Sequence, residues 1–465
     1  MTHDTRRPVT RREFTRLAMS GLVAGGTSLD AFLRQAAQST RPKPTPAQLA
    51  WQQDELAVFL HFGVNTFTDR EWGDGKESPT MFNPTALDAR QWARAAKAAR
   101  FRMMILTAKH HDGFCLWPSA TTKHTVAASP FRGGNGDVVK EFADACRAES
   151  LRIGLYCSPW DRSSPVYGDS PRYNDFFCDQ LTELLTRYGK VDEVWFDGAN
   201  GEGPNGRKQV YDWQRFWALV RRLQPQAVMF SDAGPDIRWI GNERGSAGDT
   251  NWSTMDPNAV PYPGADGLGI IAALQNGDPN GTVWRPGETD VSIRPGWFYH
   301  PAEDAKVKTV DQLVDLYFTS VGRNSKLLLN VPPTRAGLLH EIDVARLAGL
   351  KPAVAALMRG GDVTRGREAR WASTDGRSAG CEIDLGRVAT VSITDLREHI
   401  AEGQVVSEYT VEGVPDRSAQ YQVLSRGTTI GYRKLDRFPA TRVRGLRLTV
   451  RTVAPLSQPL QVRVY

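Results

Sequence analysis

The sequence has few residues that could build a metal or redox centre. Its 465 residues include five cysteines and eight histidines, and they contain no C-x-x-C pair and no Cys/His spacing typical of a metal site. A chain of this length can bury a large core without disulfide bonds. We therefore expect buried free thiols rather than a disulfide framework. The cysteines are Cys115, Cys146, Cys157, Cys178 and Cys381.

Strong charge of one sign and long apolar runs are also missing. The net charge is +6, and the first 42 residues contribute to it with seven arginines against three acidic residues. There is no basic cluster with interleaved aromatic residues, which argues against nucleic-acid binding. No stretch reaches the ~20 consecutive apolar residues that cross a bilayer. We therefore expect neither a nucleic acid nor a membrane as a partner.

Two adjacent arginines, Arg11 and Arg12, precede a weakly apolar run at residues 17–26. This arrangement looks like a twin-arginine export signal, which is removed from the mature protein. We expect residues 1–42 to be signal peptide and linker, with cleavage near residues 36–42, and the protein to be periplasmic or secreted. The other interpretation is a disordered basic tail.

Strand-like apolar runs alternate with amphipathic helical patterns over residues 43–358. This alternation indicates a parallel sheet with helical crossovers, and its length favours an α/β fold with a (β/α)8-like barrel. The segment 233–308 has weak periodicity, so we expect an irregular barrel there. The runs are 57–63, 102–109, 152–158, 193–198, 227–232 and 326–332, and the helical patterns are 87–99, 138–148, 175–188, 211–223, 311–322 and 338–358.

The pattern changes at about residue 362. Short β-rich runs separated by turn residues predict a C-terminal antiparallel β-sandwich over residues 362–465, with a mainly structural role. The runs are 382–385, 390–396, 407–414, 420–425 and 445–453.

Polar side chains gather where the predicted barrel strands end. His61, His110 and His111, Tyr156 and Asp197 lie at four successive strand ends, and a barrel of this type builds its active site at that face. The 13 tryptophans fit a carbohydrate site, because sugars stack on aromatic rings, although tryptophan also fills cores. Each residue alone has an ordinary interpretation: Asp197 as a loop cap, His61 as a core histidine, and the paired histidines as loop residues.

Several motifs in this order resemble glycoside hydrolase family 29, the α-L-fucosidases, over roughly residues 50–350. The resemblance implies a barrel followed by a β-sandwich, and retaining hydrolysis of a fucosylated oligosaccharide without metal or cofactor. It makes Asp197 the nucleophile and places His61, Glu71, Trp72, His110, His111, Tyr156 and Trp160 at the substrate. The segments are His61-Phe62-Gly63, Glu71-Trp72, residues 108–117, residues 156–160 and Trp195-Phe196-Asp197-Gly198.

The acid/base residue varies between subgroups of this family. Residues 240–245 are similar to the segment that carries it in the α-1,3/4-specific subgroup, which selects Glu243. Residues 288–297 also resemble that subgroup, so Glu288 is the second candidate for the acid and otherwise a sugar ligand. Arg294 and Trp297 of this segment are expected at the substrate. A retaining enzyme needs two carboxyl groups about 5–5.5 Å apart, one ionised and one protonated.

Three other functions remain as alternatives. A broad-specificity α-L-fucosidase would share the same site without the linkage preference. A non-catalytic fucose-binding protein would keep the fold, although both candidate carboxylates are retained. A metal-dependent hydrolase on a similar barrel would need a ligand set such as an H-x-H pair, which the sequence lacks.

Overall fold

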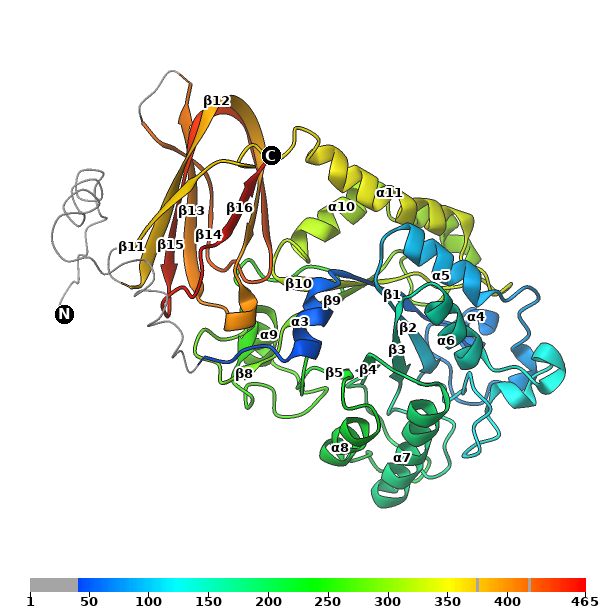
Figure 1. The fold of residues 1–465 in the computed structure, drawn as a ribbon. Helices are drawn as coiled ribbons and strands as arrows, with labels where there is room; N and C mark the ends of the chain where they lie inside the picture. The colour runs from blue at the N-terminus through cyan, green and yellow to red at the C-terminus, as the bar shows by residue number, and fades with distance from the viewer. Residues whose placement is uncertain (1–40, 374–375, 417–419) are drawn as a thin grey trace. The chain divides into compact units, whose positions relative to one another are not determined.

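The computed structural model describes residues 41–373, 376–416 and 420–465. These residues divide into two compact units, Pro42–Arg359 and Gly360–Tyr465, the second together with Arg41 (Figure 1). The predicted export signal, with Arg11 and Arg12, lies outside the described residues. Over the described part of the chain, no helix has the length and apolar character needed to cross a bilayer.

The first unit is built on a parallel sheet of eight strands in the order β5-β4-β3-β2-β1-β10-β9-β6. Phe230 of β5 also bridges Ile237, which directly precedes β6, in the parallel direction. The two edges of the sheet therefore approach each other, and the predicted barrel is confirmed as a nearly closed one. The strands are β1 (Leu56–Leu60), β2 (Met103–Lys109), β3 (Arg152–Cys157), β4 (Glu193–Trp195), β5 (Val228–Phe230), β6 (Arg238–Trp239), β9 (Gly287–Ser292) and β10 (Ser325–Asn330).

Amphipathic helices connect most of these strands. Helix α6 is typical: the carboxylate of Asp137 caps its first turn by accepting the Lys140 amide, and Val138, Phe142 and Cys146 form its buried face. Aspartates 88 and 212 cap α5 and α8 in the same way. The main helices are α5 (Ala89–Ala98), α6 (Val138–Ala148), α7 (Ser170–Arg187), α8 (Trp213–Leu223), α10 (Val310–Thr319) and α11 (Glu341–Leu357); the shorter ones are α3 (Pro46–Gln53), α4 (Val64–Thr68), η1 (Pro79–Met81), η2 (Val126–Ala128), η3 (Phe131–Gly134) and η4 (Pro301–Lys306). The short helix η5 (Ile400–Glu402) belongs to the second unit.

The barrel is irregular between β5 and β9, as predicted from the weak periodicity of residues 233–308. No helix separates β5 from β6, and the following segment contains only α9 (Leu268–Asn276) and the two-residue strands β7 (Thr254–Met255) and β8 (Val283–Trp284). The apolar runs identified six of the eight barrel strands and missed β6 and β9. Strand β9 is polar, with the sequence GETDVS, yet all of it is buried.

The second unit is one antiparallel sheet whose long strands are shared between two layers. The backbone of Tyr409 in β13 pairs with Val450 near one end of β15, while its hydroxyl donates to Asp436 near the other end at 2.6 Å. The two halves of β15 therefore face each other across a core, as the predicted sandwich requires. The runs 382–385 and 390–396 are one strand, β12, bent at a bulge beside Gly386. The strands are β11 (Ala369–Ser373), β12 (Ser378–Arg397), β13 (Val406–Pro415), β14 (Gln422–Gly427), β15 (Lys434–Thr452) and β16 (Gln461–Val464).

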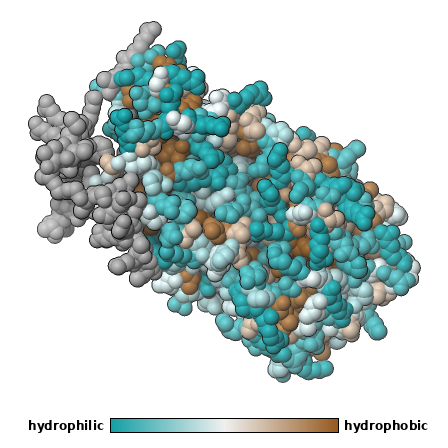
Figure 2. Space-filling view, in the orientation of Figure 1, coloured by the Kyte–Doolittle hydropathy of each residue, from teal (hydrophilic) through white to brown (hydrophobic). Residues whose placement is uncertain are grey.

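The surface drawn in Figure 2 is mostly hydrophilic, with hydrophobic side chains in small separate groups. All five cysteines are buried and unpaired, as predicted. Among large hydrophobic side chains that remain exposed, Trp72 is 57% accessible. It lines a cavity of the barrel, so its exposure bears on function.

Candidate active site

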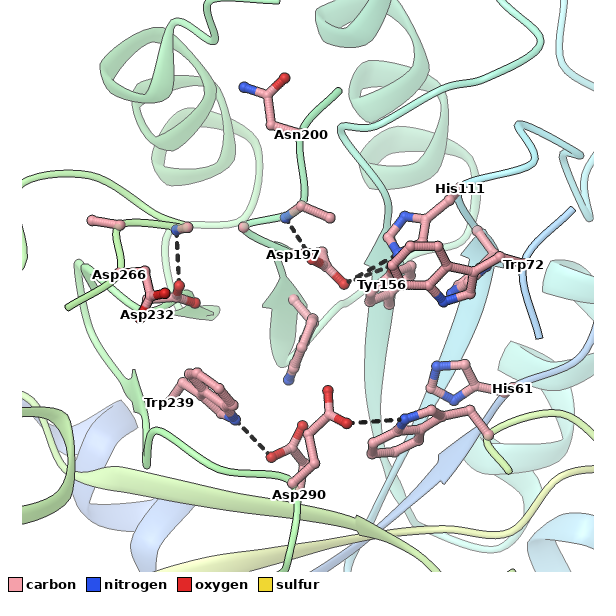
Figure 3. Close-up of a pocket in the computed structure, with 18 of the residues that line it drawn as sticks. His61, Trp72, His111, Tyr156, Asp197, Asn200, Asp232, Trp239, Asp266 and Asp290 are labelled. Carbon is pink, nitrogen blue, oxygen red and sulfur yellow. Dashed lines mark hydrogen bonds and ion pairs between the residues drawn. The ribbon is translucent and has the colours of Figure 1, made fainter. Parts of the chain in front are cut away.

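A cavity of about 580 Å³ opens where the barrel strands end. In Figure 3, His61, His111 and Tyr156 lie on one side of the cavity, and Asp232, Trp239 and Asp266 lie on the other. Eight of the residues that the sequence predicted at the site line the cavity: His61, Trp72, His110, His111, Tyr156, Asp197, Glu243 and Trp297. The lining also includes residues that were not predicted: Phe59, Trp195, Asn200, Lys208, Asp232, Trp239, Asp266, Ile271 and Asp290.

Asp197 lies two residues after the end of β4, and both of its carboxylate oxygens accept hydrogen bonds. The hydroxyl of Tyr156 donates to Oδ2 at 3.0 Å, and the backbone amide of Ala199 donates to Oδ1 at 2.7 Å. The Nε2 atom of His111 lies 3.8 Å from Oδ2. Burial, followed by the nearby Asp197 charge, raises the pKa of Tyr156 well above its ordinary value, so the phenol stays a donor. Since the Asp197 side chain is 25% exposed, an oriented carboxylate faces the cavity.

His61 presents a defined acceptor to the cavity. Its Nδ1 lies 2.9 Å from Oδ1 of Asn330, whose amide nitrogen donates to the carbonyl oxygen of Trp297 at 2.8 Å. Because a carbonyl can only accept, Asn330 must turn its own oxygen to His61, and Nδ1 must carry the proton. Burial lowers the pKa of His61 to about 3, so the ring is neutral and its Nε2 is an acceptor.

The two adjacent histidines are also neutral. Burial lowers the pKa of both His110 and His111 below the ordinary value. The ring of His111 is held by Ser158, whose Oγ lies 2.7 Å from Nδ1. The rings of His110 and His111 have centroids 4.1 Å apart, so both belong to the same wall. Uncharged imidazoles can donate or accept hydrogen bonds with sugar hydroxyls without drawing charge into the cavity.

Glu243 lies on the loop after β6, at the rim of the cavity. Its Oε2 accepts a hydrogen bond of 3.4 Å from the indole nitrogen of Trp297. Its side chain remains exposed, but the protein around it removes part of its hydration and raises its pKa, and the charges of Asp197 and Glu71 raise it further. A carboxyl group in this environment holds its proton more readily than a free glutamate does.

Two further carboxyl groups in the cavity have raised pKa values. Burial raises the pKa of Asp232 to about 6, and its side chain accepts the amide of Gly264 at 2.8 Å. Burial, together with the nearby Glu243, raises the pKa of Asp290 to about 8. Asp232 ends the predicted strand-like run 227–232, and neither Asp232 nor Asp290 was predicted at the site. Across the described ranges, no group of three or more His, Cys, Asp or Glu side chains is placed to hold a metal ion.

Comparison with known proteins decides the family. Residues 31–351 match the α-L-fucosidase family. A relative from Oryza sativa subsp. japonica, described as putative alpha-L-fucosidase 1, is 45% identical over 93% of this chain and 88% of its own length. The chain belongs to glycoside hydrolase family 29, the α-L-fucosidases.

Solved α-L-fucosidase structures share the fold. A putative α-L-fucosidase from Bacteroides ovatus has a TM-score of 0.81 at 47% identity, covering 95% of this chain and 76% of its own. The family 29 protein SpGH29 has a TM-score of 0.85 at 39% identity, covering 91% and 98%. A Ruminococcus gnavus family 29 fucosidase, solved in complex with fucose, has a TM-score of 0.81 at 30% identity, covering 91% and 95%.

Glu71 and Trp160 stand behind the fucosidase cavity rather than on its surface. Glu71 accepts the backbone amides of Trp297 at 2.8 Å and Phe298 at 3.1 Å. It therefore holds the loop that carries Trp297. The ring of Trp160 packs against Trp72 and His111, at centroid distances of 5.6 and 5.1 Å. Neither residue is among those that line the cavity.

Glu288 and Arg294 lie away from the cavity, contrary to their expected contact with substrate. Glu288 is fully buried in the barrel interior and accepts the indole nitrogen of Trp195 at 3.0 Å. The guanidinium of Arg294 pairs with Asp343 and Asp304, each at 2.8 Å, and is 1% exposed. Glu288 supports a cavity residue from below, and Arg294 ties together loops of the fucosidase barrel.

Proposed function

We propose that this fucosidase is a retaining exo-enzyme with Asp197 as nucleophile and Glu243 as general acid/base. The observation that carries the proposal is the contrast between the two groups. Asp197 receives hydrogen bonds on both oxygens, whereas the surroundings of Glu243 raise its pKa. A double displacement requires such a difference between its two carboxyl groups.

The proposed reaction has two steps. A carboxylate oxygen of Asp197 bonds to the anomeric carbon of fucose while the bond to the glycosidic oxygen breaks, and Glu243 gives its proton to that oxygen. The product of this step is a fucosyl ester on Asp197. Glu243, now ionised, takes a proton from a water molecule, whose oxygen bonds to the anomeric carbon and releases Asp197.

The same cavity supplies groups that suit a deoxy sugar. The neutral ring of His61 offers an acceptor, and His110 and His111 add further hydrogen-bonding atoms for the hydroxyls of fucose. Trp297 and Trp72 provide apolar surface for the sugar ring and its methyl group. Because burial lowers the pKa of His61 to about 3, the part of His61 in this recognition would not change between pH 5 and 8.

We propose a preference for α-1,3/4-linked fucose in branched oligosaccharides. Its support is the likeness of residues 240–245 and 288–297 to the subgroup with that specificity. The test is hydrolysis of a panel of α-1,2-, α-1,3-, α-1,4- and α-1,6-fucosylated oligosaccharides. Similar kcat/KM values for the α-1,2 and α-1,3/4 linkages would replace this proposal with a broad-specificity enzyme.

The nucleophile can be identified directly. A 2-deoxy-2-fluoro-fucosyl fluoride should inactivate the enzyme, because fluorine at C2 slows both steps while fluoride at C1 leaves easily. Proteolysis and mass spectrometry should then find the sugar on the peptide that contains Asp197. A label on a different carboxylate, or no label despite turnover of fucosides, would show that Asp197 is not the nucleophile.

A further inference from the structure

The cavity has many hydrogen-bond acceptors and few free donors. The hydroxyl of Tyr156 donates to Asp197, and the indole nitrogens of Trp239 and Trp297 donate to Asp290 and Glu243. A sugar hydroxyl has one hydrogen to give and two lone pairs that accept. A bound sugar therefore needs donors that these three side chains no longer supply.

Asp290 is a carboxyl group at the floor of this cavity. It belongs to β9, it is 4% exposed, and it points into the cavity (Figure 3). Its Oδ1 accepts the indole nitrogen of Trp239 at 2.8 Å, which fixes the plane of the carboxyl group. A protonated Asp290 would carry its hydrogen on Oδ2 and offer it as a donor.

The charges around Asp290 favour that protonated form. Among the described residues that line the cavity, Lys208 is the one lysine or arginine, and it is exposed at the rim. Burial is the main cause of the raised pKa of Asp290, and Glu243 adds to it. The titratable and charged side chains that line the cavity together with Asp290 are His61, His110, His111, Tyr156, Asp197, Lys208, Asp232, Glu243 and Asp266. On the barrel side, Asp290 interacts electrostatically with Glu288.

We propose that Asp290 is a further substrate-binding residue, which donates its carboxylic-acid hydrogen to a hydroxyl of the terminal fucose. The position of Asp290 at the cavity floor indicates that it contacts the terminal fucose rather than the rest of the glycan. An exo-enzyme holds the terminal sugar at the cavity floor, and the rest of the glycan leaves past the exposed rim at Glu243 and Asp266. This inference rests on the proposed fucosidase site.

The experiment measures binding of L-fucose to the Glu243→Gln variant by titration calorimetry between pH 7 and 9. This background removes the titration of Glu243; because the charge of Glu243 adds to the raised pKa of Asp290, that pKa is lower in this background, and the comparison with the Asp290→Asn variant assigns the pH dependence to Asp290. Ionisation replaces the donor with an acceptor, so the Kd should rise about three- to tenfold as the pH rises. In Glu243→Gln/Asp290→Asn, the amide keeps both a donor and an acceptor for Trp239, so the Kd should stay constant. The exposed Asp256→Asn in the same background is the matched control, and it should show the parent's pH dependence.

Deoxy sugars supply a second measurement that does not depend on the folding of the Asp290 variant. One of the 2-, 3- or 4-deoxy-L-fucoses should bind the Glu243→Gln parent more weakly at pH 7 and without the pH dependence. The inference is overturned if fucose binding to the parent is constant or tighter at pH 9, or if Asp290→Asn leaves the dependence unchanged. Absence of fucose binding in the parent at every pH would instead refute the proposed site as a whole.

Discussion

Replacing Glu243 with glutamine removes one proton and leaves the surrounding structure in place. The amide oxygen of glutamine can still accept the indole nitrogen of Trp297, which lies 3.4 Å from Oε2 of Glu243. Since Glu243 is exposed at the rim, the change opens no cavity in the core. The variant should therefore fold normally, and its kinetic defect should report proton transfer alone.

The size of that defect depends on the leaving group. General acid catalysis contributes roughly 10²–10⁴-fold, which corresponds to about 3–5 kcal/mol of transition-state stabilisation. We expect a loss of that size in kcat/KM for an α-1,3-fucosylated oligosaccharide, whose leaving alcohol needs a proton. A dinitrophenyl fucoside releases a stable phenolate, so its first step should slow by no more than about tenfold.

Pre-steady-state kinetics separate the two steps. With the dinitrophenyl fucoside, the variant should show a burst of phenolate followed by slow turnover, because it has no general base to activate the water molecule that hydrolyses the fucosyl ester. Azide needs no base, and it should restore turnover and yield fucosyl azide with retained configuration. Equal losses on both substrates, or near-normal rates on the oligosaccharide, would exclude Glu243. The cavity carboxyls Asp290 and Asp232 would then be the candidates, since Glu288 does not line the cavity.

Three further expectations concern other residues. Asp197→Asn should reduce kcat/KM by orders of magnitude for every fucoside, including activated ones, and azide rescue should give the inverted product; a retained product would remove Asp197 from the nucleophile's role. The pKa of His61 is lowered to about 3 in the folded protein but lies near 6.5 in the unfolded chain, so between these pH values the unfolded state binds more protons. The free energy of unfolding, measured by urea titration, should therefore fall as the pH drops from 6.5 towards 3. The fall should be smaller in His61→Gln. Arg11→Lys/Arg12→Lys should leave the protein in the cytoplasm, and unchanged periplasmic delivery in cell fractionation would contradict the proposed export signal.

The sequence could predict the regular part of the barrel because its strands are apolar on both faces. Strands β1, β2 and β3 are buried almost throughout and read as continuous hydrophobic runs. Their ends could be located, so the polar residues directly after them could be named. The two missed strands lack this signal, since β6 has two residues and β9 is rich in polar ones.

The resemblance to a family supplied residues but not the direction of their side chains. Glu71 and Trp72 are neighbours in the sequence, yet Trp72 lines the cavity and Glu71 turns to the amides of Trp297 and Phe298. Arg294 and Trp297 differ in the same way. Motif position therefore located the loops of the site, whereas packing between loops decided which side chain of each motif faces the cavity.

The two acidic residues that β9 directs to the same side, Glu288 and Asp290, have different roles because they lie at different levels of the barrel. Glu288 and Asp290 are two residues apart, so they point to the same side of the strand and lie about 6.6 Å apart along it. At the lower level, Glu288 shares the barrel interior with Glu193 and Lys326, and its side chain accepts a hydrogen bond from Trp195. At the upper level, Asp290 reaches the cavity and takes its hydrogen bond from Trp239. The lower acid can act on the reaction only by holding Trp195 in place, whereas the upper one is within reach of a sugar. The register of a polar barrel strand therefore shows which of its acidic side chains lie in the core and which line the active site.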